Sequence, residues 1–538
     1  MKQIEAVVAN INDLNDGEMR QVAVGETEIL LTRLDGKFHA IGAHCSHYKA
    51  PLAEGVLSGH HVVCPWHNAY FDVRTGDQLE PPGLDSLACY QVRIEGENVI
   101  VSIPEKTTGL RSPAMAQFNP DADGRTFVIL GAGAAGVHAA ETLRVAGYQG
   151  RIVMLTQDDR LPYDRTKLSK DYFIGETSSE EMPLRSPDFY KEHAIEVLLN
   201  KRVEQVQTTA KAITFSDSNA GTSGDSLNYD ALLVATGGKP LQLDIPGADL
   251  QNILTLRSFD DTDRILALSK QKGQAVVIGS SFIGMETAAG LSQHGLQVTV
   301  VSPDSVPFKK ILGEEIGKIF QQVHEENGVS FKLGRKAVQF EGSDKVEAVI
   351  LDNGDRLKAD IVIVGIGVQP ATDFLQGIDL HPKDGSVVVD EYLRAADGIY
   401  AAGDIARYPD WRTSESLRVE HWRVAAQQGR IAAHNMAGKA VKFKGLPLFW
   451  TMQFEFPLRY IGHAESWDEI IVDGDLQKQE FIAFYVKNNQ VLAVATSHKD
   501  TETAAISELM RLNQALTIEE LRRGTVDLIQ RQPVNNKQ

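Results

Sequence analysis

Four residues near the start of the chain have the types and spacing of a metal site. Cys45 and His47 form a C-x-H pair, and Cys64 and His67 form a C-x-x-H pair after sixteen intervening residues. Thiolate sulfur and imidazole nitrogen are ligands that iron and zinc accept in proteins. Because each pair contains one ligand of each type, the set can be divided into a cysteine pair and a histidine pair. The alternative is a Cys2His2 zinc site, whose usual spacing has both cysteines before both histidines.

The sequence around these pairs resembles the cluster loops of Rieske ferredoxins. The resemblance covers residues 40–72, AIGAHCSHYKAPLAEGVLSGHHVVCPWHNAYFD. A Rieske centre is a 2Fe-2S cluster in which two cysteines hold one iron and two histidines hold the other. Positions 50 and 66 are Ala and Trp, so the chain lacks the second cysteine pair that cross-links the loops in quinol-oxidising Rieske proteins. The likeness is therefore to the soluble ferredoxin type, and it implies four cluster ligands: Cys45, His47, Cys64 and His67.

Short β-strands are expected to position these loops. Between Ile4 and Ile103, runs such as EILLTRL and YQVRIEGENVIVSI alternate apolar and polar residues and are separated by Gly, Asp and Asn. That alternation is typical of strands, and loops between strands can aim ligands at a shared cluster. The other histidines of this region are expected at the surface or behind the ligands: His39, His44, His60 and His61.

A glycine-rich turn marks the start of a second region. Residues 106–124 carry Thr, Gly, Ser, Pro and Asp without periodicity, which is typical of a linker. Gly131, Gly133 and Gly136 then form G-x-G-x-x-G between the apolar segment TFVIL and the helical segment VHAAETLR. Glycine is needed where the backbone turns sharply, approaches a pyrophosphate and packs the helix start against the sheet. This pattern predicts a Rossmann-like dinucleotide-binding fold.

The first glycine finger departs from the usual pattern at one position. An acidic residue that holds a ribose hydroxyl is expected at the end of the second strand. The chain has Thr156 or Gln157 there. Asp158 and Asp159 follow directly and are the candidates to replace it.

A second finger, GQAVVIGSSFIGMETAAG, repeats the pattern of strand, turn and helix. Gly279 and Gly284 frame it, and Ser281 replaces the central glycine, which weakens the motif because a side chain hinders close approach of the backbone to phosphate. Two such units indicate two bound dinucleotides. The usual assignment places FAD on the first finger and a nicotinamide on the second. Ser302 stands where an acid would select NADH and no Arg lies nearby, so the sequence does not distinguish NADH from NADPH.

Further segments resemble the motifs of FAD-dependent pyridine-nucleotide oxidoreductases: LPYDRTKLSKDYF, YDALLVATGGKP, ADIVIVGIGVQP and GIYAAGDIARYPD. The chain is most similar to ferredoxin reductases of oxygenase systems and to apoptosis-inducing-factor-like proteins, particularly those with an N-terminal Rieske domain, and the likeness covers nearly the whole chain. It implies that Asp404 binds the flavin ribityl chain and that Arg165 and Lys170 lie beside the isoalloxazine. It also implies that Lys170 pairs with Glu286 near the hydride path, where a cation favours the anionic reduced flavin. These two are the predicted catalytic residues, and the alternative for each is a solvated surface charge.

Two later segments complete the resemblance. RVEHWRVAAQQGRIAAHNMAG is expected to form the helix that closes the FAD domain, with His421 and Trp422 at its start. The likeness places them close to the flavin ring, although packing in the core would give the same pattern. The strands expected from Lys444 onward resemble the C-terminal interface domain of the same reductases, which implies that Phe449 and Trp450 lie against the flavin.

The predicted fold class is multidomain, with an all-β domain, two Rossmann-like α/β domains and an α+β domain. A chain of 538 residues is long enough for several domains. We expect the following divisions: a Rieske 2Fe-2S domain at 1–105, a linker at 106–124, an FAD-binding domain at 125–250 and 375–443, an NAD(P)-binding domain at 251–374, and a C-terminal interface domain at 444–538.

Charge and cysteine content exclude other classes. The net charge of −18 argues against a nucleic acid as the main partner. Of three cysteines, two belong to the cluster pattern, and Cys89 is expected to be a small buried hydrophobic residue. No C-x-x-C lies in the flavin region, which argues against a disulfide relay. The start of the chain lacks a signal-peptide pattern and no long apolar run occurs, so we expect a cytoplasmic protein with no membrane association.

These parts together predict a reductase. A nicotinamide delivers two electrons at once, a 2Fe-2S cluster accepts one, and a flavin can mediate between them. We therefore expect electrons to pass from NAD(P)H through FAD and the Rieske cluster to an external acceptor protein, such as an oxygenase component or a cytochrome. The alternatives are a redox sensor of the apoptosis-inducing-factor type and a self-contained oxygenase. The sequence selects neither the acceptor nor a monomer over a homodimer.

Overall fold

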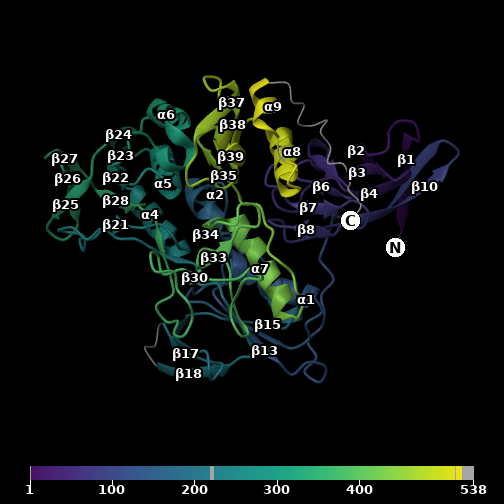
Figure 1. Ribbon diagram of the computed structural model, residues 1–538, viewed down its shortest axis with the longest axis horizontal. Helices are drawn as coiled ribbons and strands as arrows, with labels where there is room; N and C mark the ends of the chain where they lie inside the picture. The colour runs from purple at the N-terminus through teal and green to yellow at the C-terminus, as the bar shows by residue number, and fades with distance from the viewer. Residues whose placement is uncertain (1, 219–222, 515, 524–538) are drawn as a thin grey trace.

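The computed structural model describes residues 2–218, 223–514 and 516–523 (Figure 1). Its N-terminal part is all β, as predicted, and contains a six-stranded and a four-stranded antiparallel sheet. The six-stranded sheet has the order β1 (Gln3–Asn10), β11 (Asn98–Pro104), β10 (Cys89–Glu95), β4 (Lys37–Gly42), β3 (Thr27–Leu34) and β2 (Met19–Val24). The four-stranded sheet has the order β5 (Val56–Ser58), β6 (His61–Val63), β7 (Tyr70–Asp72) and β8 (Gln78–Glu80).

The two-residue period of β3 divides the interior of this domain into two cores. Leu30 packs into the core that contains Cys45 and Cys64, whereas Ile29 and Leu31 point the other way into a second core. The first ligand pair follows β4, and the second lies in the loop between β6 and β7. Both ligand loops are therefore joined directly to buried strands, which limit the movement of the loops.

The first glycine finger belongs to a mainly parallel sheet. Its order is β15 (Ile195–Leu198), β14 (Arg151–Leu155), β13 (Thr126–Leu130), β19 (Ala231–Val234), β32 (Ile399–Ala401) and β31 (Arg394–Ala396). Two helices pack against each other beside it, α1 (Ala134–Val145) and α7 (Trp422–Met436). Smaller elements complete this part: α2 (Asp171–Ile174), α3 (Pro187–Glu192), β16 (Lys201–Gln207), β17 (Ala212–Asp217), β18 (Ser223–Asn228), β30 (Val387–Val388), β33 (Ala406–Pro409), β34 (Ser416–Leu417), and the 3-10 turns η2 (Arg165–Ser169) and η3 (Ser179–Glu181). A further 3-10 turn, η1 (Leu52–Glu54), lies in the N-terminal part between β4 and β5.

The second finger lies in a parallel sheet of its own. The order is β21 (Ile253–Leu254), β28 (Ile361–Val364), β22 (Gln274–Ile278), β23 (Gln297–Ser302) and β24 (Ser330–Leu333). The helices are α4 (Phe259–Ser269), α5 (Phe282–Gln293) and α6 (Lys309–Glu326). A three-stranded sheet of β25 (Ala337–Gly342), β26 (Val346–Leu351) and β27 (Arg356–Lys358) follows, and β20 (Gly238–Pro240) pairs with β29 (Val368–Pro370).

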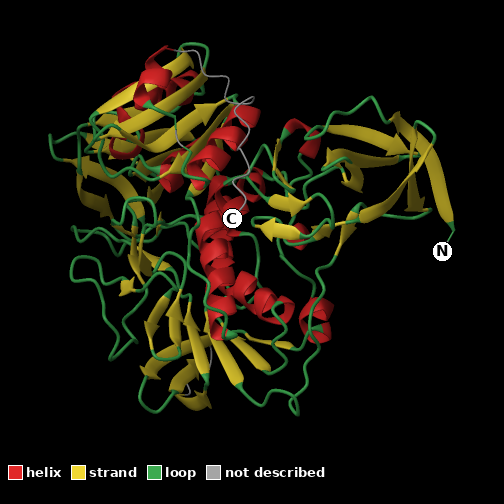
Figure 2. Ribbon diagram, turned by 45° about the vertical axis from the view of Figure 1, so that its right-hand side comes forward, coloured by secondary structure: helices red, strands yellow, loops and turns green. Residues whose placement is uncertain are grey.

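The C-terminal part is an antiparallel sheet with two helices. The strand order is β35 (Leu448–Gln453), β36 (Phe456–Gly462), β39 (Gln490–Ser497), β38 (Glu480–Lys487) and β37 (Glu469–Asp475). The helices are α8 (Asp500–Arg511) and α9 (Ile518–Arg523). In Figure 1 the purple N-terminal strands lie to the right of this part, and α8 packs against β5 of the Rieske region. Figure 2 shows the long central helices between the sheets.

Two details differ from the sequence-based expectations. The segment 106–124 is not wholly irregular, because β12 (Leu110–Arg111) pairs with β9 (Ser86–Leu87). Cys89 is exposed rather than buried, and its thiol donates a hydrogen bond to the carbonyl of Arg74. Its β10 neighbour Tyr90 points inward instead, since successive side chains of a strand alternate between faces.

Candidate redox site

The two ligand loops have the same backbone construction. The Cys45 amide donates to the Ala50 carbonyl, and the Cys64 amide donates to the Ala69 carbonyl, both at 2.9 Å. Each loop turns through one non-glycine residue in the left-handed region, Lys49 with φ 58° and Asn68 with φ 54°. This repeated turn brings both pairs of ligands to the same end of the domain.

The four ligands meet as a cysteine pair and a histidine pair. His47 Nδ1 and His67 Nδ1 lie 3.1 Å apart, and the two thiols, which are both buried, form a hydrogen bond. Among the described residues, no three His, Cys, Asp or Glu side chains are arranged around one ion. A two-iron cluster instead needs two pairs, so the donor set fits a Rieske cluster.

Burial keeps both histidines in the form that binds metal. It lowers the pKa of His47 to about 4, and it lowers the pKa of His67 well below the ordinary value of a histidine. The cations Arg459 and Lys170 and the neighbouring imidazole lower the His67 pKa further. Neutral imidazole has a free lone pair, which is what a metal ligand requires.

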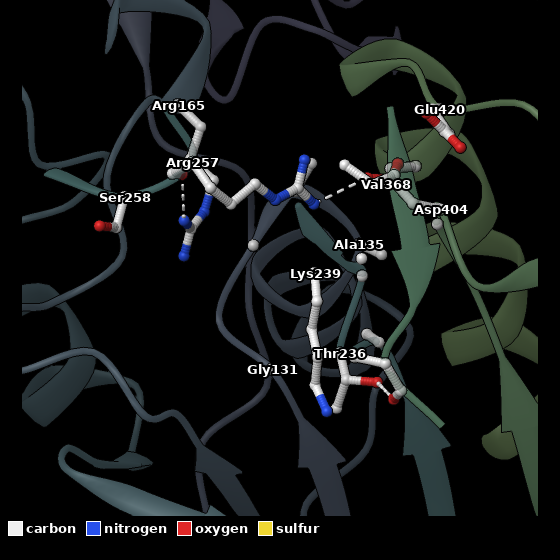
Figure 3. Close-up of a pocket in the computed structure, with 18 of the residues that line it drawn as sticks. Gly131, Ala135, Arg165, Thr236, Lys239, Arg257, Ser258, Val368, Asp404 and Glu420 are labelled. Atoms are coloured by element: carbon white, nitrogen blue, oxygen red, sulfur yellow. Dashed lines mark hydrogen bonds and ion pairs between the residues drawn. The ribbon is translucent and has the colours of Figure 1, made fainter. Parts of the chain in front are cut away.

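A cavity of about 1060 Å³ lies where both Rossmann-like sheets and the C-terminal sheet meet. Figure 3 shows part of it, with Gly131, Arg165 and Asp404 among the labelled residues. The predicted cofactor residues among its lining are Gly131, Gly133, Arg165, Lys170, Glu286, Asp404, Trp422 and Trp450, whereas Gly136, Gly279 and Gly284 do not line it. Its volume lies at the upper end of the range found for small-molecule and cofactor sites.

The glycines of the first finger have distinct roles. A Cβ on Gly131 would lie 2.3 Å from the Ala235 carbonyl oxygen, and one on Gly136 would lie 2.0 Å from the Gly131 carbonyl oxygen. Gly133 precedes α1 directly, and a Cβ there would meet nothing within 4 Å. The outer two glycines therefore permit close packing, and the middle one keeps the cavity open at the helix N-terminus, a position that suits an anionic group such as a phosphate.

The second finger has the two glycines that permit close packing, but it has a serine at the position that corresponds to Gly133. A Cβ on Gly279 would lie 2.2 Å from the Gly365 carbonyl oxygen, and one on Gly284 would lie 2.3 Å from the Gly279 carbonyl oxygen. Ser281 lines the cavity directly before α5. The strand end beyond it is buried, and the Ser280 hydroxyl hydrogen-bonds to the Ser302 hydroxyl at 2.7 Å.

Arginines lie near both strand ends that lack the usual acid. Asp158 lines the cavity and forms an ion pair with Arg165, whereas Asp159 is exposed and pairs with Arg160. At the second finger, the Arg335 backbone amide donates to the Ser302 carbonyl, so an arginine distant in sequence adjoins this strand end. The contact is made by the backbone of Arg335, because β24 lies alongside β23, and it leaves the choice between NADH and NADPH open.

Lys170 and Glu286 form the ion pair that the resemblance implied. Lys170 Nζ lies 2.8 Å from Glu286 Oε2, and the carboxylate is almost fully buried. It also accepts hydrogen bonds from the Ser169 hydroxyl at 2.5 Å and the Thr451 hydroxyl at 2.6 Å. Three donors from two parts of the chain thus satisfy one carboxylate, which makes its burial tolerable. Ser169, although it lies in LPYDRTKLSKDYF, and Thr451 were missed because a hydroxyl that hydrogen-bonds to a distant carboxylate has no signature in the local sequence.

Asp404 faces the cavity and is held by an arginine. Arg257 Nη2 lies 2.8 Å from Asp404 Oδ2, and Figure 3 shows the two side chains pointing toward each other. Arg257 was not among the predicted site residues, although LRSFDD lies at the junction between the two Rossmann-like sheets. The neighbouring Glu420 carboxyl also lines the cavity, and burial and the nearby Asp404 raise its pKa.

Aromatic side chains connect this cavity to the cluster ligands. Trp450 lines the cavity, and its ring centroid lies 4.1 Å from that of His67 and 5.8 Å from that of His47. Phe449, on the opposite face of β35, packs against His421 and Phe282. Trp450 is therefore in contact with both the flavin-sized cavity and the histidine side of the cluster.

A second aromatic residue, which the sequence did not single out, lies on the other loop. The Tyr48 ring stacks on the His47 ring with centroids 3.9 Å apart. Its hydroxyl donates to Asp164 Oδ2 at 3.4 Å, and Lys167 lies over the ring. Since Asp164 and Lys167 belong to the PYDRTKLSK segment, Tyr48 joins the Rieske loop to the flavin region.

Comparison with protein families divides the chain in the same order. The model described as pyridine nucleotide-disulphide oxidoreductase matches residues 125–429. The Rieske [2Fe-2S] domain model matches residues 5–91, and the reductase C-terminal model matches residues 448–530.

Similar proteins include apoptosis-inducing factor 3 and ferredoxin reductases. Apoptosis-inducing factor 3 of Homo sapiens is 38% identical over 524 residues, covering 95% of this chain and 85% of the relative. Putidaredoxin reductase CamA of Pseudomonas putida is 32% identical over 382 residues, covering 70% and 89%. The crystal structure of the covalent putidaredoxin reductase–putidaredoxin complex matches with a TM-score of 0.70 and 30% identity, covering 75% of this chain and 97% of that chain.

Fold, cavity and ligand set together define a flavin- and nicotinamide-dependent oxidoreductase that carries a Rieske domain. The chain belongs to the pyridine nucleotide-disulphide oxidoreductase family and is a ferredoxin-reductase-like member of it. Its cofactors are FAD, NAD(P)H and a 2Fe-2S cluster. No helix in the described part of the chain has the length and apolar character needed to cross a membrane.

Proposed function

We propose that the chain carries electrons from NAD(P)H through FAD to its own Rieske cluster and then to an external one-electron acceptor. The observation that carries this proposal is the position of Trp450, which contacts the His67 imidazole and also lines the cavity. Bound FAD supplies acceptance of two electrons from a nicotinamide and their release one at a time. A short separation between flavin site and cluster serves that transfer.

In this proposal the glycines hold the two dinucleotides. Gly131, Gly133 and Gly136 bind the FAD pyrophosphate, and Gly279 and Gly284 shape the nicotinamide dinucleotide site. What supports this assignment is the tight packing of the outer glycines and the open space at Gly133.

Charged and aromatic residues orient the flavin and nicotinamide rings. Asp404 binds the ribityl chain, and Arg165 lies beside the ring system. Lys170 and Glu286 are the catalytic pair, and Trp422 and Trp450 contact the flavin ring. All six line the cavity, and the ion pair between Lys170 and Glu286 supports their joint assignment.

The external acceptor is proposed to be a protein, as in the complex of putidaredoxin reductase with putidaredoxin. In this chain the fused Rieske domain already lies against Trp450. We include a cytoplasmic location in the proposal, based on the absence of a disulfide between the three cysteines. The oligomeric state, monomer or homodimer, does not affect this electron path.

The alternative of a redox sensor is favoured by one observation, the similarity to apoptosis-inducing factor 3. Continuous catalytic turnover distinguishes a reductase from such a sensor. Purified protein with bound FAD and cluster is expected to reduce cytochrome c or ferricyanide continuously with NADH or NADPH. Negligible turnover with both nucleotides would contradict the reductase proposal and favour the sensor.

Cluster ligands provide the second test. Cys64→Ser or His67→Ala is expected to abolish the EPR signal of the cluster and cytochrome c reduction, because both residues belong to the ligand set. Flavin reduction by NAD(P)H should remain close to the wild-type rate, since neither residue lines the cavity. Cytochrome c reduction that persists without the cluster would show that electrons do not leave the protein through the Rieske domain.

A further inference from the structure

Two buried arginines of the reductase hold the loop that carries Cys64 and His67. Arg423 donates through Nη2 to the Asn68 carbonyl at 2.9 Å and through Nε to the Pro81 carbonyl at 3.1 Å. Arg459 donates through Nε to the Trp66 carbonyl at 2.9 Å. The carbonyls at positions 66 and 68 flank His67, so both cations approach the cluster loop at its ligand.

These arginines are far from water and only partly neutralised. Arg423 is 2% exposed, and its third nitrogen, Nη1, donates to the Leu446 carbonyl at 3.2 Å. Within the described residues no carboxylate lies at ion-pair distance from it. Arg459 forms an ion pair with Asp500, which is itself partly exposed. A buried cation bonded to neutral carbonyls keeps most of its field, because little solvent screens it.

Both arginines are placed by elements that also line the flavin cavity. Arg423 follows Trp422 at the start of α7, and Arg459 is the cross-strand partner of Trp450 in the β35–β36 pair. The two arginines beside the cluster loop therefore belong to the same helix, α7, and the same hairpin, β35–β36, as Trp422 and Trp450, which line the flavin cavity.

We propose that Arg423 and Arg459 raise the reduction potential of the docked cluster, and that cluster reduction and docking of the Rieske domain therefore stabilise each other. The inference rests on the proposed function, because it requires the bound cluster. In the step concerned, the reduced flavin loses one electron and the cluster gains it, so the cluster region gains one negative charge. Nearby buried cations favour that product.

Docking and reduction are linked reciprocally. If contact with the two cations makes the cluster easier to reduce, then the reduced cluster must hold the Rieske domain on the reductase more tightly by the same factor. The two arginines are thus positioning residues whose charge also directs electrons from flavin to cluster. Neither of them contacts the reacting flavin atoms directly in this assignment.

The test is an EPR-monitored redox titration of the cluster in the full-length protein. Arg423→Gln and Arg459→Gln are each expected to shift the one-electron equilibrium toward the oxidised cluster by about tenfold, which lowers the potential by ~59 mV. Arg423→Lys keeps the charge and should shift the potential less than Arg423→Gln. The matched control is Arg93→Gln, because Arg93 is an exposed arginine of the Rieske domain that pairs with surface carboxylates.

Two outcomes of the titration are decisive. If both glutamine variants show a normal cluster signal and the wild-type potential, the inference is overturned. If the unaltered protein shows no cluster signal, the proposed function fails instead. Should Arg423→Gln fail to fold, Arg459→Gln decides, because Arg459 lies on a different element and the Asp500 carboxylate that loses its ion pair is partly exposed to water.

Discussion

At the scale of single residues, the Glu286 carboxylate shows how the proposed catalytic pair of Lys170 and Glu286 is held. A buried carboxylate needs a partner for each oxygen, and here Oε2 accepts from Lys170 and Ser169 while Oε1 accepts from Thr451. Thr451 adjoins Trp450 in β35, so one strand contacts both the catalytic pair and a cluster ligand. Its hydroxyl thereby orients Glu286, and through it Lys170.

We predict that Thr451→Val slows flavin reduction by NAD(P)H by roughly tenfold, because a hydrogen bond to a charged, buried carboxylate is lost without a large change of shape. Stopped-flow absorbance at the flavin band measures this rate. The matched control is Thr496→Val in β39 of the same sheet, a buried threonine whose hydroxyl bonds to Thr503. An unchanged rate in Thr451→Val would show that Glu286 needs no such partner.

At the scale of elements, α8 anchors the Rieske domain through one buried carboxylate. Glu508 accepts from Ser58 at 2.6 Å, from Tyr70 at 3.1 Å and from His61 at 3.3 Å. The first and third of these residues belong to the strands that lead to the Cys64 loop, and the second belongs to the strand that leaves it. Arg511 on the same helix neutralises the charge. Helix α8 thus contacts both β6 and β7, the strands before and after the loop that carries Cys64 and His67.

The Glu508 contact predicts a loss of stability in acid. Burial alone would raise the pKa of this carboxyl, but hydrogen bonds from Arg511 and His61 hold the pKa well below its usual value of 4.5. A lowered pKa means that the stabilisation is complete above about pH 4.5 and decreases as the pH falls further. Glu508→Gln is expected to cost about 3–5 kcal/mol of domain stability at neutral pH.

Thermal unfolding between pH 7 and pH 3 measures this effect. Wild-type protein should lose more stability on acidification than Glu508→Gln, because the variant has no carboxylate to protonate. Glu502→Gln is the control, since Glu502 is half-exposed in the first turn of the same helix. Parallel acid profiles for wild type and Glu508→Gln would contradict the assignment.

At the scale of the whole molecule, the Rieske domain lies on the reductase as a docked unit. Besides the contacts of Glu508 and the two arginines, Arg185 reaches Asp85 at 2.7 Å, and Gln427 donates to Glu80 at 2.8 Å. The interface is rich in hydrogen bonds and charges, with a small apolar cluster between β5–β7 and α8. Fusion keeps donor and acceptor together at a high effective concentration.

We therefore predict that cluster reduction is intramolecular. Its rate after rapid mixing with NAD(P)H should be constant over about a hundredfold range of protein concentration, because covalent linkage replaces diffusional encounter. Stopped-flow recordings at the cluster band provide the measurement. A rate that rises in proportion to protein concentration would mean that one molecule reduces the cluster of another.

The sequence alone determined the parts and their order. Four ligands with unusual alternation and two glycine fingers are short-range patterns, and the chemistry of a ligand or a tight turn depends mainly on residue type and local spacing. The order of the domains and the cofactors followed from these patterns together with the family resemblance, and the matched families lie in that order along the chain. Cys89 was misjudged because alternation along β10 does not reveal which face is covered.

Only the tertiary structure decided how the parts meet. Trp450 and His67 are hundreds of residues apart in sequence, as are Glu508 and Tyr70, and no local pattern links them. Arg423 and Arg459 were not singled out from the sequence, since a side chain that binds backbone carbonyls places little demand on the sequence it contacts. Such contacts arise from packing between domains, whereas the cluster ligands can be identified from residue type and spacing within each loop.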